Sequence, residues 1–369
     1  MSRAAPMSIS TRKDDHVLLS VKERVTSSAT TLLEDVIFVH HTIPRCALAD
    51  ISLESDFLGK AVSAPVMISG MTGGSPLAEK INRSLAAVAQ KLKIPLGVGS
   101  QRAALVDREL ARTFSVVRDV APDIPVVANI GASQVSRGLS ASQVLELVEM
   151  VRADALAVHL NPLQEALQPE GEPDMRSFIE NLRQLARESP VPVLLKQTGE
   201  GFSREAALMV KGLVKGIDVG GAGGTSFAVI EGLRARLRGL DELEEMASTF
   251  ASWGIPTAAS ILEVRSALPD IFLIASGGLT TGVDVAKALR LGADFAGIAR
   301  PVLLKLYYGG EQAAERYLRR VVSELRVAVF LTGSCSLEEL RKTPVIVKGL
   351  LKEWVLQRGL EIPRGAGYG

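Results

Sequence analysis

Residues 154–171 read DALAVHLNPLQEALQPEG, and the rest of the chain can be interpreted outward from them. The apolar start, residues 155–158, predicts a short buried strand, and polar side chains begin at His159. Side chains of a strand alternate between its two faces, so His159 and Asn161 would point the same way. Pro162 cannot donate a ladder hydrogen bond, so we expect the strand to end there and pass into a loop. Polar groups at the carboxyl end of a strand are typical of an α/β active site, although a polar loop capping a structural strand fits the same pattern.

The composition of the 369-residue chain excludes several classes of protein. Apolar residues make up 47% and the formal net charge is +1, which predicts neither a nucleic-acid-binding nor a membrane-binding protein. No stretch is long and apolar enough to span a bilayer, and the first 16 residues have no signal-peptide core. Cys46 and Cys335 have neither CxxC nor histidine-paired spacing, and they fit a reduced cytosolic protein better than a disulfide scaffold.

Short apolar segments recur along the chain, and nearly all are followed by a helical pattern. The eight predicted strands are residues 65–69, 95–99, 124–129, 155–158, 192–196, 215–221, 271–276 and 294–299. Such alternation indicates parallel strands covered by helices, and eight strands close a (β/α)8 barrel. An open doubly wound sheet would carry GxGxxG after its first strand, and MTGGS does not match it. The predicted fold is therefore an α/β TIM barrel.

Three segments extend this barrel. Residues 1–60 are expected to form an N-terminal arm and packing segment, 61–310 the barrel, and 311–369 extra C-terminal helices packed on it. The long connection after the sixth strand, residues 221–258, indicates a lid or an added helix, with helical character at 240–253. The polar residues 1–20 fit either a solvated tail or a lid that carries anion-binding groups.

Polar residues follow the predicted strands and would converge on the face of the barrel where catalytic loops lie. They are Met71, Thr72, Ser100, Gln101, Arg102, Asn129, His159, Asn161 and Lys196. The glycine-rich stretches at 276–282 and 297–305 come where barrels commonly bind phosphate, and Thr225 adds a hydroxyl. A phosphate-bearing cofactor there would lay its reactive ring near the Lys196 ammonium. Glu165 and Glu170 suit a divalent cation, but each is equally well read as a solvated acid.

Several of these stretches together resemble the type 2, FMN-dependent isopentenyl-diphosphate isomerases. The matching stretches are APVMISGMTGG, GVGSQR, ANIG, HLNPLQEALQPEG, GAGGTS, WGIPTAAS, ASGG and RVAVFLTG, with RKDDH near the N-terminus. The resemblance covers nearly the whole chain. It implies a cytoplasmic TIM-barrel enzyme that interconverts isopentenyl and dimethylallyl diphosphate with FMN and Mg²⁺. It also implies NADPH or another reductant for FMN, and a homo-oligomer, a tetramer or an octamer.

The resemblance also implies a role for individual residues. FMN would contact Gly70, Met71, Thr72, Ser100, Asn129, Lys196, Thr225, Gly278, Leu279, Thr280, Ala299 and Arg300. The substrate would contact Arg12, Lys13, His16, Ser100, Gln101, Arg102, His159, Asn161 and Gln164. Gln164 and His159 would be catalytic, and Glu165 would hold Mg²⁺. Because a glutamine is a poor general acid, Gln164 is expected to orient groups rather than to ionise.

Three positions depart from the family pattern. Thr280 stands where an arginine is usual near the cofactor phosphate, which is expected to make FMN retention more sensitive to salt. Phe227 stands where a tryptophan is usual, and residues 197–199 read Gln-Thr-Gly in place of Glu-Val-Gly.

Two other functions fit a barrel with these glycine-rich loops. A flavin oxidoreductase of the hydroxy-acid oxidase type would need a histidine base and two arginines late in the barrel. The Thr280 substitution and the basic residues near the N-terminus argue against it. A non-catalytic phosphate-binding barrel, acting as a sensor or scaffold, is opposed by Gln164, Glu165 and Lys196 at the barrel mouth.

Overall fold

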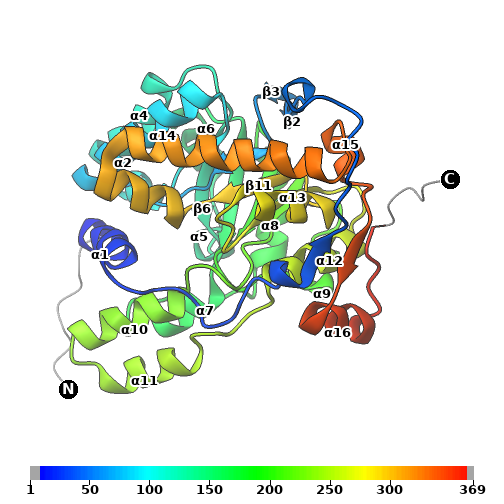
Figure 1. Ribbon diagram of the computed structural model, residues 1–369. Coiled ribbons are helices and arrows are strands. Elements are labelled where there is room, and N and C mark those ends of the chain that lie inside the picture. The colour runs from blue at the N-terminus through cyan, green and yellow to red at the C-terminus, as the bar shows by residue number, and fades with distance from the viewer. Residues whose placement is uncertain (1–8, 364–369) are drawn as a thin grey trace.

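A closed barrel of eight parallel strands forms the centre of the computed structural model, which describes residues 9–363 (Figure 1). In order around the barrel these are β4 (Val66–Ile68), β5 (Leu96–Gly97), β6 (Val126–Gly131), β7 (Ala155–Leu160), β8 (Val193–Gln197), β9 (Gly216–Asp218), β10 (Phe272–Ser276) and β11 (Phe295–Ile298). β11 pairs with β4 and closes the ring. Each strand overlaps one of the eight predicted segments, so the predicted TIM barrel is confirmed.

A hairpin upstream of the barrel packs against its interior. It consists of β2 (Ser55–Phe57) and β3 (Lys60–Val62), which pair antiparallel. Phe57 is fully buried and makes edge contacts with Phe272 and Phe295, with ring centroids 5.3 and 5.1 Å apart. These rings join a cluster of inward-facing strand residues that includes Met67, so the barrel interior is filled with side chains. Space for a ligand is found instead at the carboxyl ends of the strands.

The helices around the barrel follow from ordinary capping and amphipathic patterns. They include α2 (Pro76–Leu92), α3 (Arg102–Val106), α4 (Arg112–Val120), α5 (Ala132–Ser136), α6 (Ala141–Met150), α8 (Phe178–Glu188), α9 (Arg204–Met209), α12 (Thr257–Ala267) and α13 (Gly282–Arg290). In α2, Ser75 caps the first turn by accepting from Ala78 N at 3.1 Å, and Pro76 occupies the first helical position. Ser203 caps α9 as predicted, accepting from Ala206 N at 3.2 Å.

The N-terminal residues from Ile9 onward form a docked helix, α1 (Ile9–Lys22), that contacts α2, α10 (Phe227–Leu237) and α14 (Arg300–Leu331). Val17 and Val21 of this helix are buried, so the described part of the arm is not a solvated tail. Residues 1–8 of the expected N-terminal arm lie outside the described residues. After α1 the chain passes the barrel mouth, where Ser27 N donates to Gly224 O at 2.8 Å.

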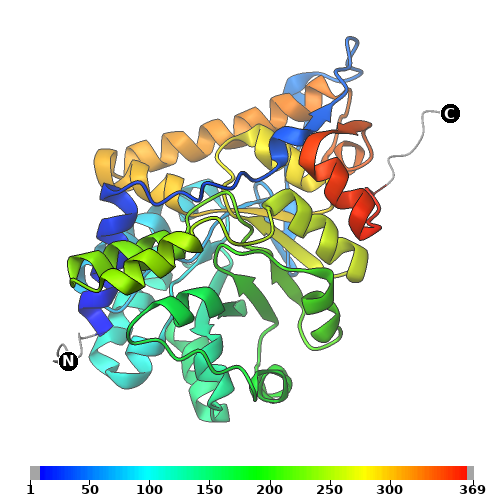
Figure 2. The same ribbon diagram turned by 90° about the horizontal axis from the view of Figure 1, so that it is seen from below.

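This segment then joins the C-terminal end of the protein. β1 (Val36–Phe38) pairs antiparallel with β12 (Val345–Val347). In Figure 2 the dark blue N-terminal segment runs from α1 to the red C-terminal part, which carries α16 (Gly349–Arg358). The remaining short elements are η1 (Leu33–Asp35), η2 (Leu48–Asp50), η3 (Arg108–Ala111) and α15 (Leu337–Leu340). Segments from both ends of the chain therefore share one surface of the barrel.

Three expectations differ from the structure. The residues after β7 form a helix, α7 (Pro162–Leu167), rather than a loop, because a proline at the first helical position needs no N–H partner. The insertion after β9 holds two helices, α10 and α11 (Asp241–Thr249), of which only the second was predicted. The C-terminal helix α14 begins earlier than expected, at Arg300, and breaks at Gly310, where φ is 68°.

Two observations concern the chain as a whole. No helix within residues 9–363 is long and apolar enough to cross a membrane. Cys46 and Cys335 are distant in sequence but adjacent in space, because Cys46 Sγ lies 3.6 Å from the carbonyl oxygen of Ser334 and hydrogen-bonds the Cys335 thiol. Spacing along the sequence gave no sign of this contact.

Candidate active site

A cavity of about 340 Å³ opens at the carboxyl ends of the barrel strands. Its lining includes almost every residue that the sequence predicted for cofactor, substrate and metal. These are Arg12, Lys13, His16, Gly70, Met71, Thr72, Ser100, Arg102, Asn129, His159, Asn161, Gln164, Glu165, Lys196, Thr225, Gly278, Leu279, Thr280, Ala299 and Arg300. Residues that are dispersed along the sequence thus meet at one end of the barrel.

Gln101 is the predicted site residue that the structure places elsewhere. Its side chain is fully buried, donates to Leu147 O at 2.9 Å and accepts from Asn129 N at 2.9 Å. Both ends of the amide are therefore occupied by backbone, and Gln101 holds the end of β6 in place. A direct contact between Gln101 and substrate is not supported by this position.

His159 lies at the end of β7 as a neutral imidazole. Burial, followed by the charges of Lys13 and Lys196, lowers the pKa of His159 to about 3. Its Nδ1 donates to Oδ1 of Asn129 at 2.8 Å, which leaves Nε2 as an acceptor. The ring has room because its neighbour on β6 is Gly131, where a Cβ atom would lie 3.1 Å from the imidazole. His159 is thus held in one orientation and one tautomer.

Lys196 lies beside His159 on the adjacent strand and belongs to a network that the sequence did not reveal. Its Nζ is 2.8 Å from Oδ2 of Asp218 and 3.4 Å from Oγ of Ser276. Ser276 in turn donates to Oδ1 of Asp218 at 2.5 Å. The ammonium is therefore fixed by groups from β9 and β10. Asp218 ends β9, but the predicted strand ran on to residue 221, so the position of polar residues at strand ends did not identify it.

The glycine-rich loops after β9 and β10 pack backbone against backbone. A Cβ atom at Gly224 would lie 2.4 Å from Gly278 N, and one at Gly277 would lie 2.1 Å from Gly221 O. Gly277 and Gly278 also have positive φ angles of 102° and 78°, which glycine adopts readily. These loops pack closely enough that the backbone of their glycines forms part of the cavity wall.

Two helices begin at this wall, and they differ in how their first turns are capped. The N-terminus of α13 is capped from within, since Asp284 Oδ2 accepts from Thr280 N at 3.0 Å and from Thr281 N at 2.9 Å. The N-terminus of α14 has no side-chain cap. Arg300 there donates to Ser20 O at 2.7 Å, so its guanidinium is bound to the N-terminal segment. An anion at this corner would be bound by the open end of α14 more readily than by α13.

The FMN implied by the sequence resemblance fits these groups. Ser69 Oγ and Thr72 Oγ1 are buried at the cavity wall and have no hydrogen-bond partner among the described residues. Unpartnered buried hydroxyls are uncommon, because each costs free energy unless a ligand or water completes it. With the backbone wall and the fixed Lys196 ammonium, they suit a polar ring that carries a phosphate.

A cationic rim lies on the side of the cavity covered by α1. Lys13 Nζ donates to Ser100 O at 3.0 Å, and Arg12 and Arg102 are close enough to act on its charge. Burial, with these two guanidinium groups, lowers the pKa of Lys13 to about 7. Three basic groups gathered at one place form a site for a strongly anionic ligand.

Glu165 lines the cavity close to this rim. Its Oε1 accepts from Asn161 Nδ2 at 3.0 Å, and its Oε2 accepts from Glu172 N at 2.8 Å. No group of three or more histidine, cysteine or acidic residues within 9–363 is placed to hold a metal ion. A single carboxylate still suits Mg²⁺, which usually completes its shell with substrate oxygens and water.

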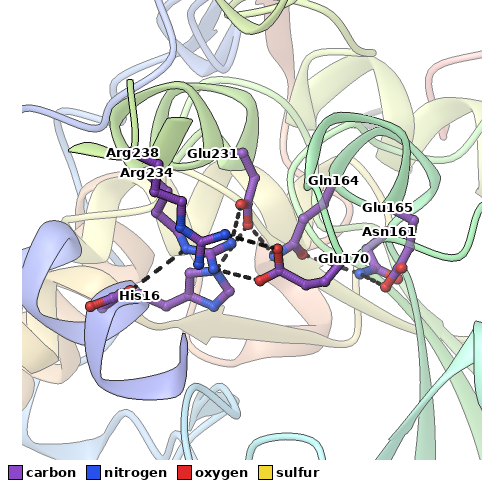
Figure 3. Close-up of polar contacts among 9 residues, drawn as sticks. His16, Asn161, Gln164, Glu165, Glu170, Glu231, Arg234 and Arg238 are labelled. Atoms are coloured by element: carbon purple, nitrogen blue, oxygen red, sulfur yellow. Dashed lines mark hydrogen bonds and ion pairs between the residues drawn. The ribbon is translucent and has the colours of Figure 1, made fainter. Parts of the chain in front are cut away.

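A buried polar network lies next to this rim and to Glu165, and it is shown in Figure 3. Gln164 Nε2 donates to Oε1 of Glu231 at 2.9 Å, and the His16 Nε2 atom lies 2.9 Å from the same oxygen. Gln164 Oε1 accepts from Asn161 Nδ2 at 3.1 Å, so both ends of its amide are fixed. Burial opposes the charge on Glu231, but His16, Arg234 and Gln164 outweigh it and lower the pKa of Glu231 to about 2. A fully buried carboxylate is thus kept ionised next to Gln164.

The comparisons with known proteins agree with this geometry. The FMN-dependent dehydrogenase family matches residues 123–348. A protein of Methanopyrus kandleri named isopentenyl-diphosphate delta-isomerase is 47% identical over 352 residues, 95% of each chain. One of the same name from Metallosphaera sedula is 44% identical over 358 residues, 96% of this chain and 97% of that one.

Solved structures share the fold. A flavocytochrome b2 variant superposes with a TM-score of 0.68 at 15% identity, over 94% of this chain and 87% of that one. A mandelate oxidase variant with an FMN adduct superposes with a TM-score of 0.61 at 18% identity, over 90% and 92%. These likenesses concern the barrel alone, whereas the sequence relatives match almost from end to end. The chain therefore belongs to the isopentenyl-diphosphate delta-isomerase family, and it contains an FMN-dependent dehydrogenase domain.

Proposed function

We propose that this enzyme moves the double bond between isopentenyl and dimethylallyl diphosphate, with FMN and Mg²⁺ in the cavity. The observation that carries the proposal is a cavity that combines a cationic rim with a buried polar network, in a chain with relatives of that name. A cationic rim of Arg12, Lys13 and Arg102 suits a diphosphate, and a buried polar network at Gln164 and Glu231 suits a small apolar tail that exchanges protons. The hydroxy-acid oxidase alternative is supported by the FMN-dependent dehydrogenase match and by likeness of fold, but at only 15–18% identity to the oxidase and flavocytochrome structures.

The rim residues would bind the diphosphate by charge-assisted hydrogen bonds, which are about twice as strong as neutral ones. Glu165 would be a ligand of Mg²⁺, which would neutralise part of the negative charge of the diphosphate. His159, with Nε2 free as an acceptor, would receive a hydrogen bond from a bound water or a protonated ligand oxygen. Because α1 covers this side of the cavity, its docking would also keep bulk water from the reacting carbons.

The reaction needs one proton added to the substrate and another removed. When bound in its reduced form, FMN would supply the acid–base chemistry at the alkene. Gln164 does not ionise, and both ends of its amide are hydrogen-bonded, to Asn161 and to Glu231. It would therefore orient the alkene or act as a proton relay. Lys196, paired with Asp218, would place a fixed positive charge at the cavity wall, where it would stabilise an anionic flavin. NADPH as reductant of FMN, a cytoplasmic location and a tetramer or octamer are part of the same proposal and are supported by the sequence resemblance.

The direct test is product analysis with the photoreduced protein. Purified protein should show a flavin spectrum that survives dialysis, and after photoreduction it should convert isopentenyl diphosphate to dimethylallyl diphosphate when Mg²⁺ is present. Air-oxidised protein and protein with a metal chelator are the controls, and both should be nearly inactive. Colourless protein that does not bind added FMN would contradict the proposal. A yellow protein without turnover would instead favour the sensor or scaffold function.

Substrate affinity should fall as the pH rises through about 7. A diphosphate binds the protonated ammonium of Lys13, and the pKa of Lys13 in the free protein is lowered to about 7 by burial and by Arg12 and Arg102. Above this pH, binding must be accompanied by proton uptake, so KM should rise by up to about tenfold per pH unit. The measurement is KM between about pH 7 and 9, compared with Lys13→Met, in which this slope should disappear. Lys22→Met, an exposed lysine of the same helix, should keep the slope.

A further inference from the structure

Arg234 lies at the centre of the polar network in Figure 3, although it does not line the cavity. Its side chain is only 1% exposed. Nη1 is 2.5 Å from Oε2 of Glu231, Nη2 is 2.5 Å from Oε1 of Glu170, and Nε is 3.9 Å from Oδ2 of Asp15. These three carboxylates belong to α10, to the segment after α7 and to α1. One guanidinium therefore connects three parts of the chain that surround the candidate active site.

Glu231 has two oxygens with different partners. Oε1 accepts from Gln164 and faces His16, whereas Oε2 is held by Arg234. By holding Oε2, Arg234 fixes the orientation of the Glu231 carboxylate, so that Oε1 points at Gln164. A guanidinium stays protonated at every pH at which proteins work. Arg234 is therefore the partner that supplies Glu231 with a permanent positive charge.

Stability alone is a weak reason for such a cluster. Taking an arginine and a carboxylate out of water is expensive, and a well-packed apolar pair would often stabilise the fold as much or more. The nearby charged groups also face the network from each side. Asp15, His16 and Arg12 come from α1, Glu170 from the segment after α7, and Arg238 directly follows the last residue of α10. On its other side, α11 presents Ala247 to Gly232 of α10.

We propose that Arg234 is a positioning residue that keeps Glu231 ionised and directed at Gln164, and that its contacts with Asp15 and Glu170 make this alignment depend on the docking of α1. The substrate clamp on α1 and the proton-exchanging end of the cavity are then coupled through one side chain. This inference rests on the proposed isomerase function, because its effects are measured on that reaction.

Replacing Arg234 by methionine should lower kcat on the order of a hundredfold, since Glu231 loses its permanent countercharge and its second anchor. The pH profile of kcat should gain a new fall on the acid side, because Glu231 would then take up a proton closer to neutral pH. Arg234→Lys, which keeps the charge without the two-pronged geometry, should recover part of kcat. Arg236→Met, an exposed arginine of the same helix, is the matched control and should behave like the unaltered protein.

A double variant separates this role from a purely structural one. If Arg234 acts through Glu231, then Arg234→Met/Glu231→Gln should be no slower than Glu231→Gln alone, since an amide needs no countercharge. The comparison also works if Arg234→Met alone does not fold, because the double variant buries no unpaired carboxylate. Losses in kcat that multiply between the two sites would overturn the proposal.

The coupling to α1 has its own readout. Asp15→Asn should shift the pH profile of kcat in the same direction as Arg234→Met, by a smaller amount, while the flavin spectrum is unchanged. An unchanged profile would overturn this half of the inference. Unaltered protein that does not isomerise its substrate would count against the proposed function. Active protein whose profile is the same with Arg234→Met would count against the role of Arg234 alone.

Discussion

Replacing Gln164 by alanine should lower turnover by on the order of a hundredfold or more, with little change in the binding of diphosphate. The reason is geometric. Gln164 is buried, its amide is fixed by Glu231 and Asn161, and none of the described hydrogen bonds joins it to Arg12, Lys13 or Arg102, so its removal leaves these anion-binding groups in place. The measurements are kcat with isopentenyl diphosphate and the Kd of inorganic diphosphate, both with Mg²⁺.

The matched control is Gln184→Ala, an exposed glutamine on α8, which should leave both quantities unchanged. Gln164→Asn should resemble the alanine variant, because the shorter side chain cannot reach both fixed partners. Near-normal turnover of Gln164→Ala would remove this residue from the mechanism. A parallel loss of diphosphate affinity would show that it supports the whole site rather than the alkene end.

The second large effect is expected at the N-terminal helix. Arg12→Ala/Lys13→Ala should raise KM for isopentenyl diphosphate by about 10²- to 10⁴-fold, because two charge-assisted hydrogen bonds of roughly 1.5–3 kcal/mol each are lost. Neither residue belongs to the predicted FMN set, so the flavin spectrum should be unchanged. Steady-state kinetics at physiological salt measure the effect.

Lys22→Ala/Arg24→Ala gives the appropriate comparison, since it removes the same charge from exposed positions of the same segment. Its KM should stay within about twofold of the unaltered protein, because exposed charges contribute little at physiological salt. If Arg12→Ala/Lys13→Ala behaves in the same way, α1 is a cover for the barrel and not part of the substrate site.

The barrel could be predicted from sequence because each strand repeats one signal, an apolar segment followed by a helical pattern. Helix α10 could not be predicted in this way, and two of its residues explain why. Glu231 and Arg234 are 0% and 1% exposed, so the inner face of this helix is polar where an amphipathic pattern would place apolar side chains. Their burial depends on partners from α1 and from the segment after α7, which no local pattern contains.

In the candidate site, too, the position of a residue on its strand could be predicted from sequence, but its partners from distant parts of the chain could not. The ends of the strands identified His159 and Lys196, since position on a parallel strand determines which end of the barrel a residue occupies. Their partners depend on the register between strands, so Asp218 was not recognised. Gln101 was predicted to contact the substrate because adjacent polar residues after β5 look alike in sequence. Only the fold shows that Ser100 lines the cavity, whereas the Gln101 side chain is buried and bonded to the backbone of Leu147 and Asn129.

Ribosomal synthesis delivers β1 early and β12 almost last, yet these two strands pair with each other. The segment between α1 and β1 is also bound by Arg300, which donates to Glu23 O at 3.1 Å. The N-terminal segment that covers the cavity can therefore dock fully only after the C-terminal part of the chain has been synthesised, whereas the eight barrel strands are complete by Ile298. We expect a nascent barrel to pass through a stage in which its mouth is open, and this stage is the natural time for a tightly held cofactor to enter.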